Sequence, residues 1–339
     1  MTYGDDPYSP QEIMVSEHRP TRRTLLKAAG GLTVAAGLGA GTILATSAAA
    51  SAAGDGFGLH IVDSNQADPR MWYYRFQTAE IGWQPAVNVL LPDGYHDSGG
   101  RRYPVLYLLH GGLQDFITFD REGIRAWTAG KPLIVVMPDG GKAGWYSNPV
   151  TTNVGPRNYE NFHLNQLVRW VDANFRTYDE PAGRAVSGFS MGGFGALKYT
   201  AKYFGHFASV SSHSGPASIR RDGGLVANWA NASSAAVELN GGTIYGVPWD
   251  ENRVTMDNPM QNIERYRGKR IFLVAGTSPS SDPGDYINET QVLAGHREFR
   301  AALDQAGIPY LHHEDAGGHF IRHDRMIEDI DGIINHLRT

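Results

Sequence analysis

The chain has 339 residues, with 35 acidic and 30 basic side chains, a formal net charge of −5 at pH 7 and no cysteine. The absence of cysteine excludes disulfides, iron–sulfur clusters and thiolate zinc sites, so the fold must be stabilised by packing alone. The slight acidic excess, with no basic block beyond the N-terminal segment, argues against nucleic-acid binding and against a polybasic membrane contact. We therefore expect a small molecule or a cell-envelope component as the partner.

The N-terminal 53 residues are predicted to be an export signal rather than part of the fold. Arg22 and Arg23 form a twin-arginine pair, and an apolar run of mostly Ala and Gly follows over residues 28–49. This pattern is typical of a Tat signal peptide, and small residues near position 50 offer cleavage sites. We expect cleavage of residues 1–53 and a product that is secreted or held in the cell envelope. A retained membrane anchor is the alternative, because the run is long enough to span a bilayer.

After this signal the predicted strands and helices alternate. Strands are predicted over residues 72–77, 86–91, 105–109 and 133–137, followed by a helix over 159–175, a strand over 184–187, a helix over 195–201, strands over 208–211 and 271–275, a helix over 289–306, a strand over 310–313 and a helix over 321–337. This alternation predicts an α/β fold with a mostly parallel central sheet and helices on both faces. We expect residues 54–339 to form a single domain.

One interval breaks the alternation. Residues 214–270 are rich in Gly, Asn, Ser and aromatic side chains and show no strong periodicity. We predict a loop-rich excursion that passes over the active site. Its aromatic residues Trp229, Tyr245 and Trp249 are candidates for a sugar-binding platform, and they are equally consistent with packing.

The most informative motif is G-x-S-x-G, which occurs at residues 188–192 with Ser190 at its centre. The residues before it can form a short strand, and those after it can form a helix. A serine at such a strand-to-helix turn exposes its hydroxyl and is typical of a catalytic nucleophile. Ser190 is therefore the predicted nucleophile of an α/β-hydrolase fold.

A serine hydroxyl needs a base, and the base needs an orienting acid. His319, in the loop between the last predicted strand and the last helix, is the predicted base because the fold places its residues in the order Ser, acid, His. Three carboxylates follow the strand that ends at Ala275, namely Asp282, Asp285 and Glu289. The residues alone leave the choice among these acids open.

The tetrahedral oxyanion of acyl transfer needs hydrogen-bond donors. We predict that Met191 N–H, which follows the nucleophile, is one donor. The second is Gly112 N–H, or that of Leu113, in the glycine loop after the strand over 105–109; both sources match the fold. His319 and His323 are four residues apart, but no metal-binding motif accompanies them, so we expect neither a metal nor a cofactor.

Four motifs together, at residues 188–192, 144–148, 159–162 and 318–319, resemble the esterase D family of α/β-hydrolases. Within it the chain is most similar to the mycolyltransferases of the antigen 85 type, and the resemblance spans nearly all of residues 54–339. In that family the acid is a Glu about ten residues before a Phe, a spacing that Glu289 and Phe299 reproduce. The resemblance therefore favours Glu289, and it implies that Ser190 accepts an acyl group and passes it to water or to a sugar hydroxyl.

The chain departs from the mycolyltransferase pattern where the trehalose acceptor is handled. Those enzymes have an Asp where His110 stands, an Arg near Leu113, and a Trp where this chain has Ile321. The departures put trehalose mycolylation in doubt and leave the predicted triad and oxyanion donors intact.

The expected function is that of an exported serine esterase or acyltransferase. It would form an acyl-enzyme on Ser190 from a small-molecule ester or acyl-lipid and transfer the acyl group to water or to a sugar or alcohol hydroxyl. We expect no nucleic-acid partner and contact with a membrane only during export. The alternatives are mycolyltransferase-like transfer to trehalose or a cell-wall glycan, and a non-catalytic envelope binding protein on the same fold.

Overall fold

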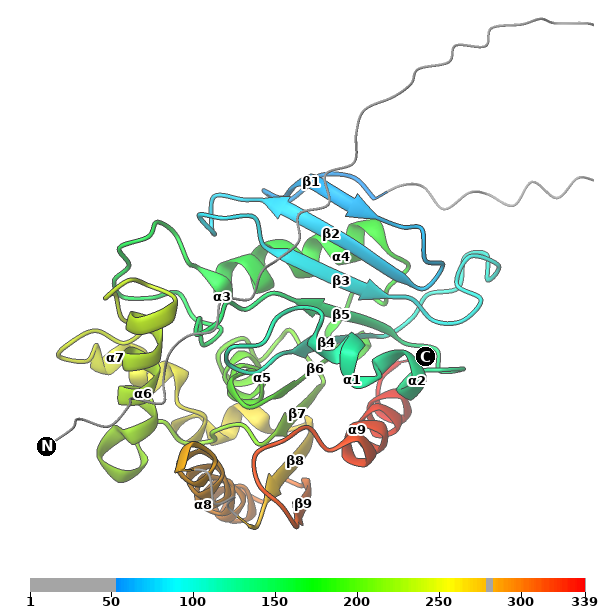
Figure 1. The fold of residues 1–339 in the computed structure, drawn as a ribbon. Helices are drawn as coiled ribbons and strands as arrows, with labels where there is room; N and C mark the ends of the chain where they lie inside the picture. The colour runs from blue at the N-terminus through cyan, green and yellow to red at the C-terminus, as the bar shows by residue number, and fades with distance from the viewer. Residues whose placement is uncertain (1–52, 279–282, 339) are drawn as a thin grey trace, which may run out of the picture. The chain divides into compact units, whose positions relative to one another are not determined.

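A computed structural model describes residues 53–278 and 283–338 (Figure 1). All of the predicted export signal except its last residue lies outside the described residues, as does Asp282. The described residues belong to one compact unit, Ser47–Thr339. Among them, no helix combines the length and the apolar character that crossing a membrane would require.

Strands and helices alternate along most of this unit. The strands are β1 (His60–Asn65), β2 (Met71–Gln77), β3 (Ala86–Leu90), β4 (Val105–Leu109), β5 (Ile134–Pro138), β6 (Arg184–Phe189), β7 (Ser209–His213), β8 (Arg270–Gly276) and β9 (Leu311–Asp315). The α-helices are α1 (Thr118–Glu122), α2 (Ile124–Trp127), α3 (Tyr159–Asn161), α4 (Val168–Asn174), α5 (Met191–Lys202), α6 (Arg221–Val237), α7 (Glu251–Asp257), α8 (Pro283–Gln305) and α9 (His323–His336). Shorter segments are the π-helical η1 (Phe162–Leu167) and the 3-10 turns η2 (Pro181–Gly183), η3 (Pro259–Gln261) and η4 (Ile263–Tyr266).

The strands form one nine-stranded sheet in the order β1-β2-β3-β5-β4-β6-β7-β8-β9. From β5 to β9 each strand is parallel to its neighbour, whereas β1, β2 and β3 join antiparallel at the β5 side. The five strands β3 to β7 are buried along their whole length, which is why they appear in the sequence as apolar or small-residue runs. The predicted mostly parallel sheet is confirmed.

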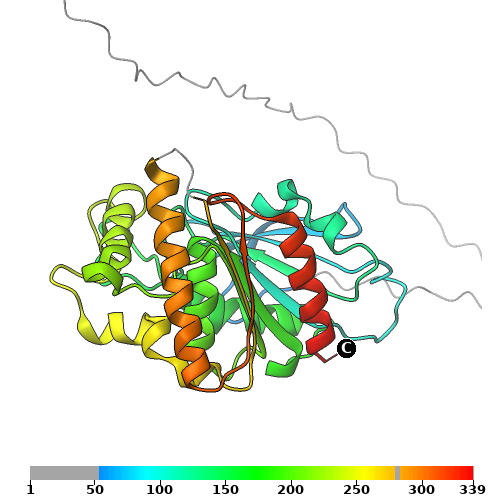
Figure 2. The same ribbon diagram turned by 90° about the horizontal axis from the view of Figure 1, so that it is seen from below.

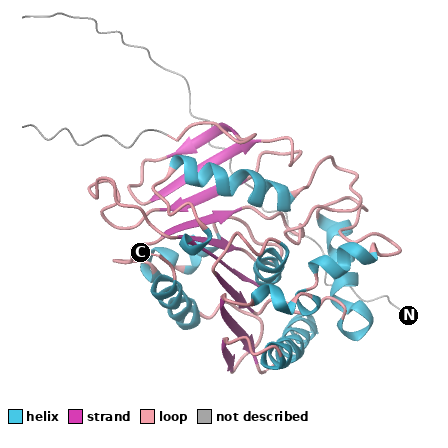
Figure 3. Ribbon diagram, turned by 180° about the vertical axis from the view of Figure 1, so that it is seen from behind, coloured by secondary structure: helices cyan, strands magenta, loops and turns pink. Residues whose placement is uncertain are grey.

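Helices cover both faces of the sheet (Figures 2 and 3). On one face α4, α5 and α8 contribute Trp170, Phe194 and Phe299 to the larger core cluster. On the other face α1 and α9 contribute Phe119 and Met326 to a second cluster. Because parallel strands end at the same edge of the sheet, the loops after β4, β6, β8 and β9 can meet above that edge.

The structure differs from the sequence prediction in the interval over residues 214–270. We predicted a loop-rich excursion, and the structure contains α6 and α7 there. Helix α6 packs through small side chains such as Ala227, Ala230 and Ser234, so it has no stripe of large apolar residues that a periodicity search could detect. Asp222, Gly223 and Gly224, at positive φ, interrupt its first turn.

Candidate active site

Ser190 lies at the sharp turn between β6 and α5. Its backbone has φ 54° and ψ −118°, an uncommon conformation for a residue with a side chain, and its N–H donates a 2.8 Å hydrogen bond to the carbonyl of His213 on β7. A Cβ on Gly188 would collide with Gly192 backbone atoms, and a Cβ on Gly192 would collide with the Leu109 carbonyl. Both glycines of the motif are therefore required by the close approach of β4 and α5.

His319 lies in the loop between β9 and α9, next to this turn. Its Nε2 is 2.8 Å from Ser190 Oγ, and its Nδ1 is 2.6 Å from Glu289 Oε2. A carboxylate can only accept, so Nδ1 carries the proton and donates to Glu289, and Nε2 accepts from the Ser190 hydroxyl. The imidazole is thus held in the tautomer that can remove the serine proton.

Glu289 is buried in α8, and three separate elements hold its carboxylate. Oε2 accepts from His319, while Oε1 accepts from the Ser214 hydroxyl at 3.0 Å and from Gly276 N–H at the end of β8. The structure therefore brings Glu289 together with Ser190 and His319. Of the other two candidate acids, Asp285 has its backbone on α8 and a side chain outside the described part, and Asp282 lies outside it entirely.

Sequence reasoning missed Arg322, whose side chain holds the loop that carries His319. Its buried guanidinium donates to the carbonyls of Gly318 at 2.9 Å and Phe320 at 3.3 Å, and it stacks on the Phe320 ring with its Cζ 4.3 Å from the centroid. Burial lowers the pKa of Arg322, and nearby Glu289 opposes this shift. Ser214 was missed too, because nothing in the local sequence links it to Glu289. For Arg322 the available signal was its place in the sequence, three residues after the predicted base.

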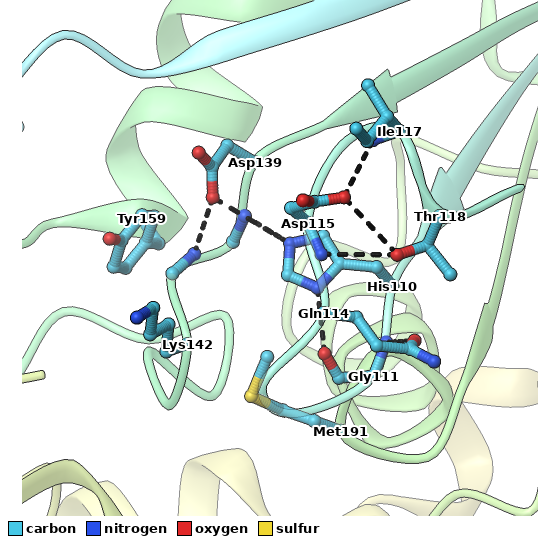
Figure 4. Close-up of polar contacts among 12 residues, drawn as sticks. His110, Gly111, Gln114, Asp115, Ile117, Thr118, Asp139, Lys142, Tyr159 and Met191 are labelled. Atoms are coloured by element: carbon cyan, nitrogen blue, oxygen red, sulfur yellow. Dashed lines mark hydrogen bonds and ion pairs between the residues drawn. The ribbon is translucent and has the colours of Figure 1, made fainter. Parts of the chain in front are cut away.

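The predicted oxyanion donors come from the residue after the nucleophile and from the glycine loop that follows β4. Met191 is the first residue of α5, so its N–H has no acceptor within the helix. Leu113 N–H donates to the Lys142 carbonyl at 2.7 Å, whereas Gly112 lines the same cavity as Ser190 and Met191. Of the two loop amides that the sequence left open, Gly112 N–H is therefore the one that is free to face the cavity (Figure 4 shows the loop).

A mostly apolar cavity of about 300 Å³ opens beside Ser190. Its walls come from the glycine loop, the loop after β5, the serine turn and α6: Gly112, Leu113, Lys142, Ala143, Trp145, Phe189, Ser190, Met191, Trp229, Ser233, Val237 and His319. Of the three aromatic residues proposed as a platform, Trp229 lines this cavity, Tyr245 is fully buried in the core, and Trp249 packs against the core. The cavity resembles a binding site for an apolar group more than a sugar platform.

A buried ion cluster, made of Lys198, Lys202, Glu160 and Asp257, ties α5 to the loop over residues 144–148. The fully buried Lys198 ammonium donates to Tyr146 O and Ser147 Oγ, both at 2.7 Å, and pairs with Glu160 at 2.8 Å. Burial opposes ionisation of Glu160, but the two lysines outweigh it and lower its pKa to about 2. Two of the motifs that carried the family resemblance, at 144–148 and 159–162, therefore meet in this cluster.

The described residues contain no group of three or more His, Asp or Glu side chains that could hold a metal. His323, four residues after His319, pairs instead with Glu122 at 2.8 Å near the surface.

A serine turn between a buried parallel strand and its helix, with a histidine in the loop after the last strand, defines the α/β-hydrolase fold. The model of the Esterase family matches residues 78–323, so the chain belongs to this family. The chain is 67% identical over 290 residues to "Esterase Rv1288" of Mycobacterium tuberculosis (strain ATCC 25618 / H37Rv), a match that covers 84% of this chain and 63% of the relative. The chain thus spans less than two-thirds of that relative's length.

The predicted similarity to the antigen 85 type is also confirmed. The chain is 34% identical over 126 residues to "Diacylglycerol acyltransferase/mycolyltransferase Ag85A" of Mycobacterium tuberculosis (strain CDC 1551 / Oshkosh), which covers 35% of this chain and 37% of the relative. The crystal structure of Mycobacterium tuberculosis MPT51 (FbpC1) superposes with a TM-score of 0.61 at 20% identity, covering 77% of this chain and 97% of that one. The similarity to MPT51, at this level of identity, shows a shared fold and nothing more.

Proposed function

We propose that this chain is a serine esterase or acyltransferase that acts through an acyl-enzyme on Ser190. The observation that carries the proposal is the unbroken hydrogen-bond chain from Ser190 Oγ through His319 to Glu289, at 2.8 and 2.6 Å. The Ser190 end of this series of hydrogen bonds lines a cavity that Gly112 and Met191 also line. Nucleophile, base, acid and oxyanion donors are all within one site, as acyl transfer needs.

In the proposed reaction His319 Nε2 takes the Ser190 proton while Oγ attacks the ester carbonyl. The carbonyl oxygen becomes an oxyanion that accepts from Gly112 and Met191 N–H. The tetrahedral intermediate collapses, His319 returns the proton to the leaving alcohol, and an acyl-enzyme remains. Water or another alcohol then gives its proton to His319 and attacks the acyl carbon, which releases the acid or a new ester and restores Ser190.

The cavity favours an apolar acyl group as the part of the substrate that is recognised. Trp145, Met191, Trp229 and Val237 line it beside Ser190, and the surroundings include few polar side chains. At Leu113, one of the positions that the resemblance assigns to acceptor handling, the side chain is apolar and 73% exposed, so it offers no hydrogen bond to a sugar hydroxyl. We therefore propose hydrolysis as the main outcome, with transfer to an added alcohol as a secondary one.

The test is hydrolysis of p-nitrophenyl esters with short and long acyl chains by residues 54–339 and by the Ser190→Ala variant, with and without trehalose or glucose. We expect activity that the substitution abolishes. A sugar ester among the products would make the chain an acyltransferase. Equal activity in both proteins would refute the role of Ser190, and no activity in either would favour a non-catalytic binding protein.

We further propose export by the Tat pathway, on the basis of Arg22, Arg23 and the apolar run over residues 28–49. Replacing both arginines by lysine in the full chain should retain the protein inside a bacterial host that has a Tat system. Export that persists after this change would contradict the proposal.

A further inference from the structure

We propose that His110 is a positioning residue that fixes the oxyanion donor, by holding the Gly111–Gly112 peptide in one orientation. The inference rests on the proposed function, because it assigns Gly112 N–H as a donor to the reacting carbonyl. His110 follows the end of β4, its side chain is buried, and it contacts neither the cavity nor the predicted triad directly. Its two ring nitrogens are nevertheless both engaged by the loops that form the oxyanion side of the site (Figure 4).

The hydrogen bonds of the ring determine which nitrogen carries the proton. Gly140 N–H donates to His110 Nε2 at 2.8 Å, so Nε2 must be the unprotonated acceptor. The neighbouring carboxylate oxygen Oδ1 of Asp139 is 3.8 Å from Nε2, beyond hydrogen-bond distance, and it accepts instead from Gly141 N–H at 3.0 Å. The proton is therefore on Nδ1, which donates to the Gly111 carbonyl at 2.8 Å.

Holding the Gly111 carbonyl also orients the next amide. In a planar trans peptide the C=O of one residue and the N–H of the next point in opposite directions. The bond from His110 Nδ1 fixes the Gly111 carbonyl on the protein side, so Gly112 N–H must point away from it, toward the cavity. A rotation of this one peptide would replace the donor by a carbonyl oxygen and repel an oxyanion.

The neighbouring polar groups of the loop are held as well. The Tyr146 hydroxyl donates to the His110 carbonyl at 2.8 Å, and Gly111 N–H donates to Gln114 Oε1 at 2.7 Å. Leu113 N–H donates to the Lys142 carbonyl. Within the described part of the chain, the amide of Gly112 is left without an acceptor. The Gly111 carbonyl also accepts from Gln114 N–H at 3.3 Å, so the 2.8 Å bond from His110 Nδ1 is the shorter of the two bonds that hold the Gly111–Gly112 peptide. Two adjacent glycines resist rotation of this peptide least.

The bonding of His110 also affects which acceptor alcohol the site could bind. The resemblance places an acceptor-binding Asp here in the mycolyltransferases, whereas His110 in this chain is only 1% exposed and uses both ring nitrogens internally. The residue is thus assigned to the oxyanion loop and is unavailable to a sugar hydroxyl.

The test uses two variants that each keep one half of the imidazole's bonding. In His110→Asn the amide N–H can replace Nδ1 and donate to Gly111, whereas in His110→Gln the side-chain carbonyl can replace Nε2 and accept from Gly140. Each is assayed with an ester and with its thionoester, because sulfur is a weak acceptor and profits little from oxyanion donors. His296→Gln is the control, since His296 is a buried histidine whose Nε2 bonds the Gly215 carbonyl and whose ring bonds no residue of the glycine loop.

We expect the Gln variant to lose about 100-fold in kcat on the ester, with KM little changed and a much smaller loss on the thionoester. The Asn variant and the control should keep the wild-type ratio of ester to thionoester rates. Folding is checked for each by circular dichroism and Tm. A folded Gln variant with the wild-type ratio would overturn the proposal, as would equal losses on both substrates.

Failure of the proposed function is distinguishable, because wild-type protein would then show no hydrolysis that depends on Ser190. Crystal structures of the same variants would decide the positioning role in that case. A Gly111 carbonyl that has rotated in the Gln variant and not in the Asn variant supports it, and an unmoved carbonyl in both overturns it.

Discussion

Replacement of Glu289 by glutamine is the sharpest test of the acid. The side chain keeps its size, so the change acts on hydrogen bonding and charge and leaves the packing as it is. Oε1 accepts from two donors, the Ser214 hydroxyl and Gly276 N–H. The amide oxygen of Gln must take this place, because an NH₂ group there would face two donors. The NH₂ group is then directed at His319 Nδ1.

This arrangement forces the wrong tautomer on the imidazole. His319 Nδ1 must become an acceptor, so the proton moves to Nε2 and faces Ser190 Oγ, which loses its base. The corresponding Asp to Asn change in a serine protease lowers kcat by about 10⁴-fold, which is about 5 kcal/mol of activation free energy. We expect a loss of that size for Glu289→Gln, with KM and Tm close to those of the wild type.

The assay is steady-state hydrolysis of a p-nitrophenyl ester over the pH range in which the protein is folded. Glu298→Gln is the matched control, since it makes the same change on the same helix at an exposed side chain. Asp285→Asn and Asp282→Asn complete the set and should retain activity. A Glu289→Gln variant within tenfold of the wild type, or a larger loss in either Asp variant, would refute the assignment of the acid.

Three other results are expected. The two lysines of the buried ion cluster lower the folded-state pKa of Glu160 from 4.5 to about 2, against the effect of burial. The ionised Glu160 therefore stabilises the fold by about 3 kcal/mol above pH 4.5, and this stabilisation is lost as the pH falls toward 2. Tm measured against pH should drop more steeply in the wild type than in Glu160→Gln. Trp229→Ala enlarges the cavity and should shift the preferred p-nitrophenyl ester toward longer acyl chains, and an unchanged profile would contradict the acyl assignment. Gly192→Ala should fail to fold, since its Cβ would overlap the carbonyl at the end of β4, whereas Gly205→Ala, with open space around its Cβ, should melt as the wild type does.

The sequence was sufficient for most of the sheet because strands buried on both faces leave apolar runs that need no partner to be recognised. Strand β1 was missed for the opposite reason: it is a mostly exposed edge strand in which two adjacent apolar residues, Ile61 and Val62, stand among polar ones without alternation. Helix α8 begins at Pro283, six residues before its predicted start, because its first turn contains Pro and Gly, two poor helix formers, and shows no apolar stripe.

The predicted triad positions could be found because the fold imposes a chain order and a local motif on them. The residues that hold the acid and the base in place could not be found in this way. Ser214, Gly276 and Arg322 reach the acid and the loop of the base from three separate parts of the chain, and only the folded chain shows that they meet. The same holds for His110, which the sequence marked only as a departure from the mycolyltransferase pattern. Its ring bonds to Gly140, thirty residues away.

The three departures from that pattern have a common physical effect. At position 110 the Asp is replaced by a histidine that is turned inward and fully engaged, and near it an apolar Leu113 stands where an Arg is expected, with 73% of its surface exposed. Ile321 likewise replaces a Trp. Each change removes a side chain that could orient a sugar hydroxyl, and none touches the groups that would activate Ser190. Because transfer to an alcohol competes with water only when the alcohol is held in place, these departures support our proposal that hydrolysis is the main outcome.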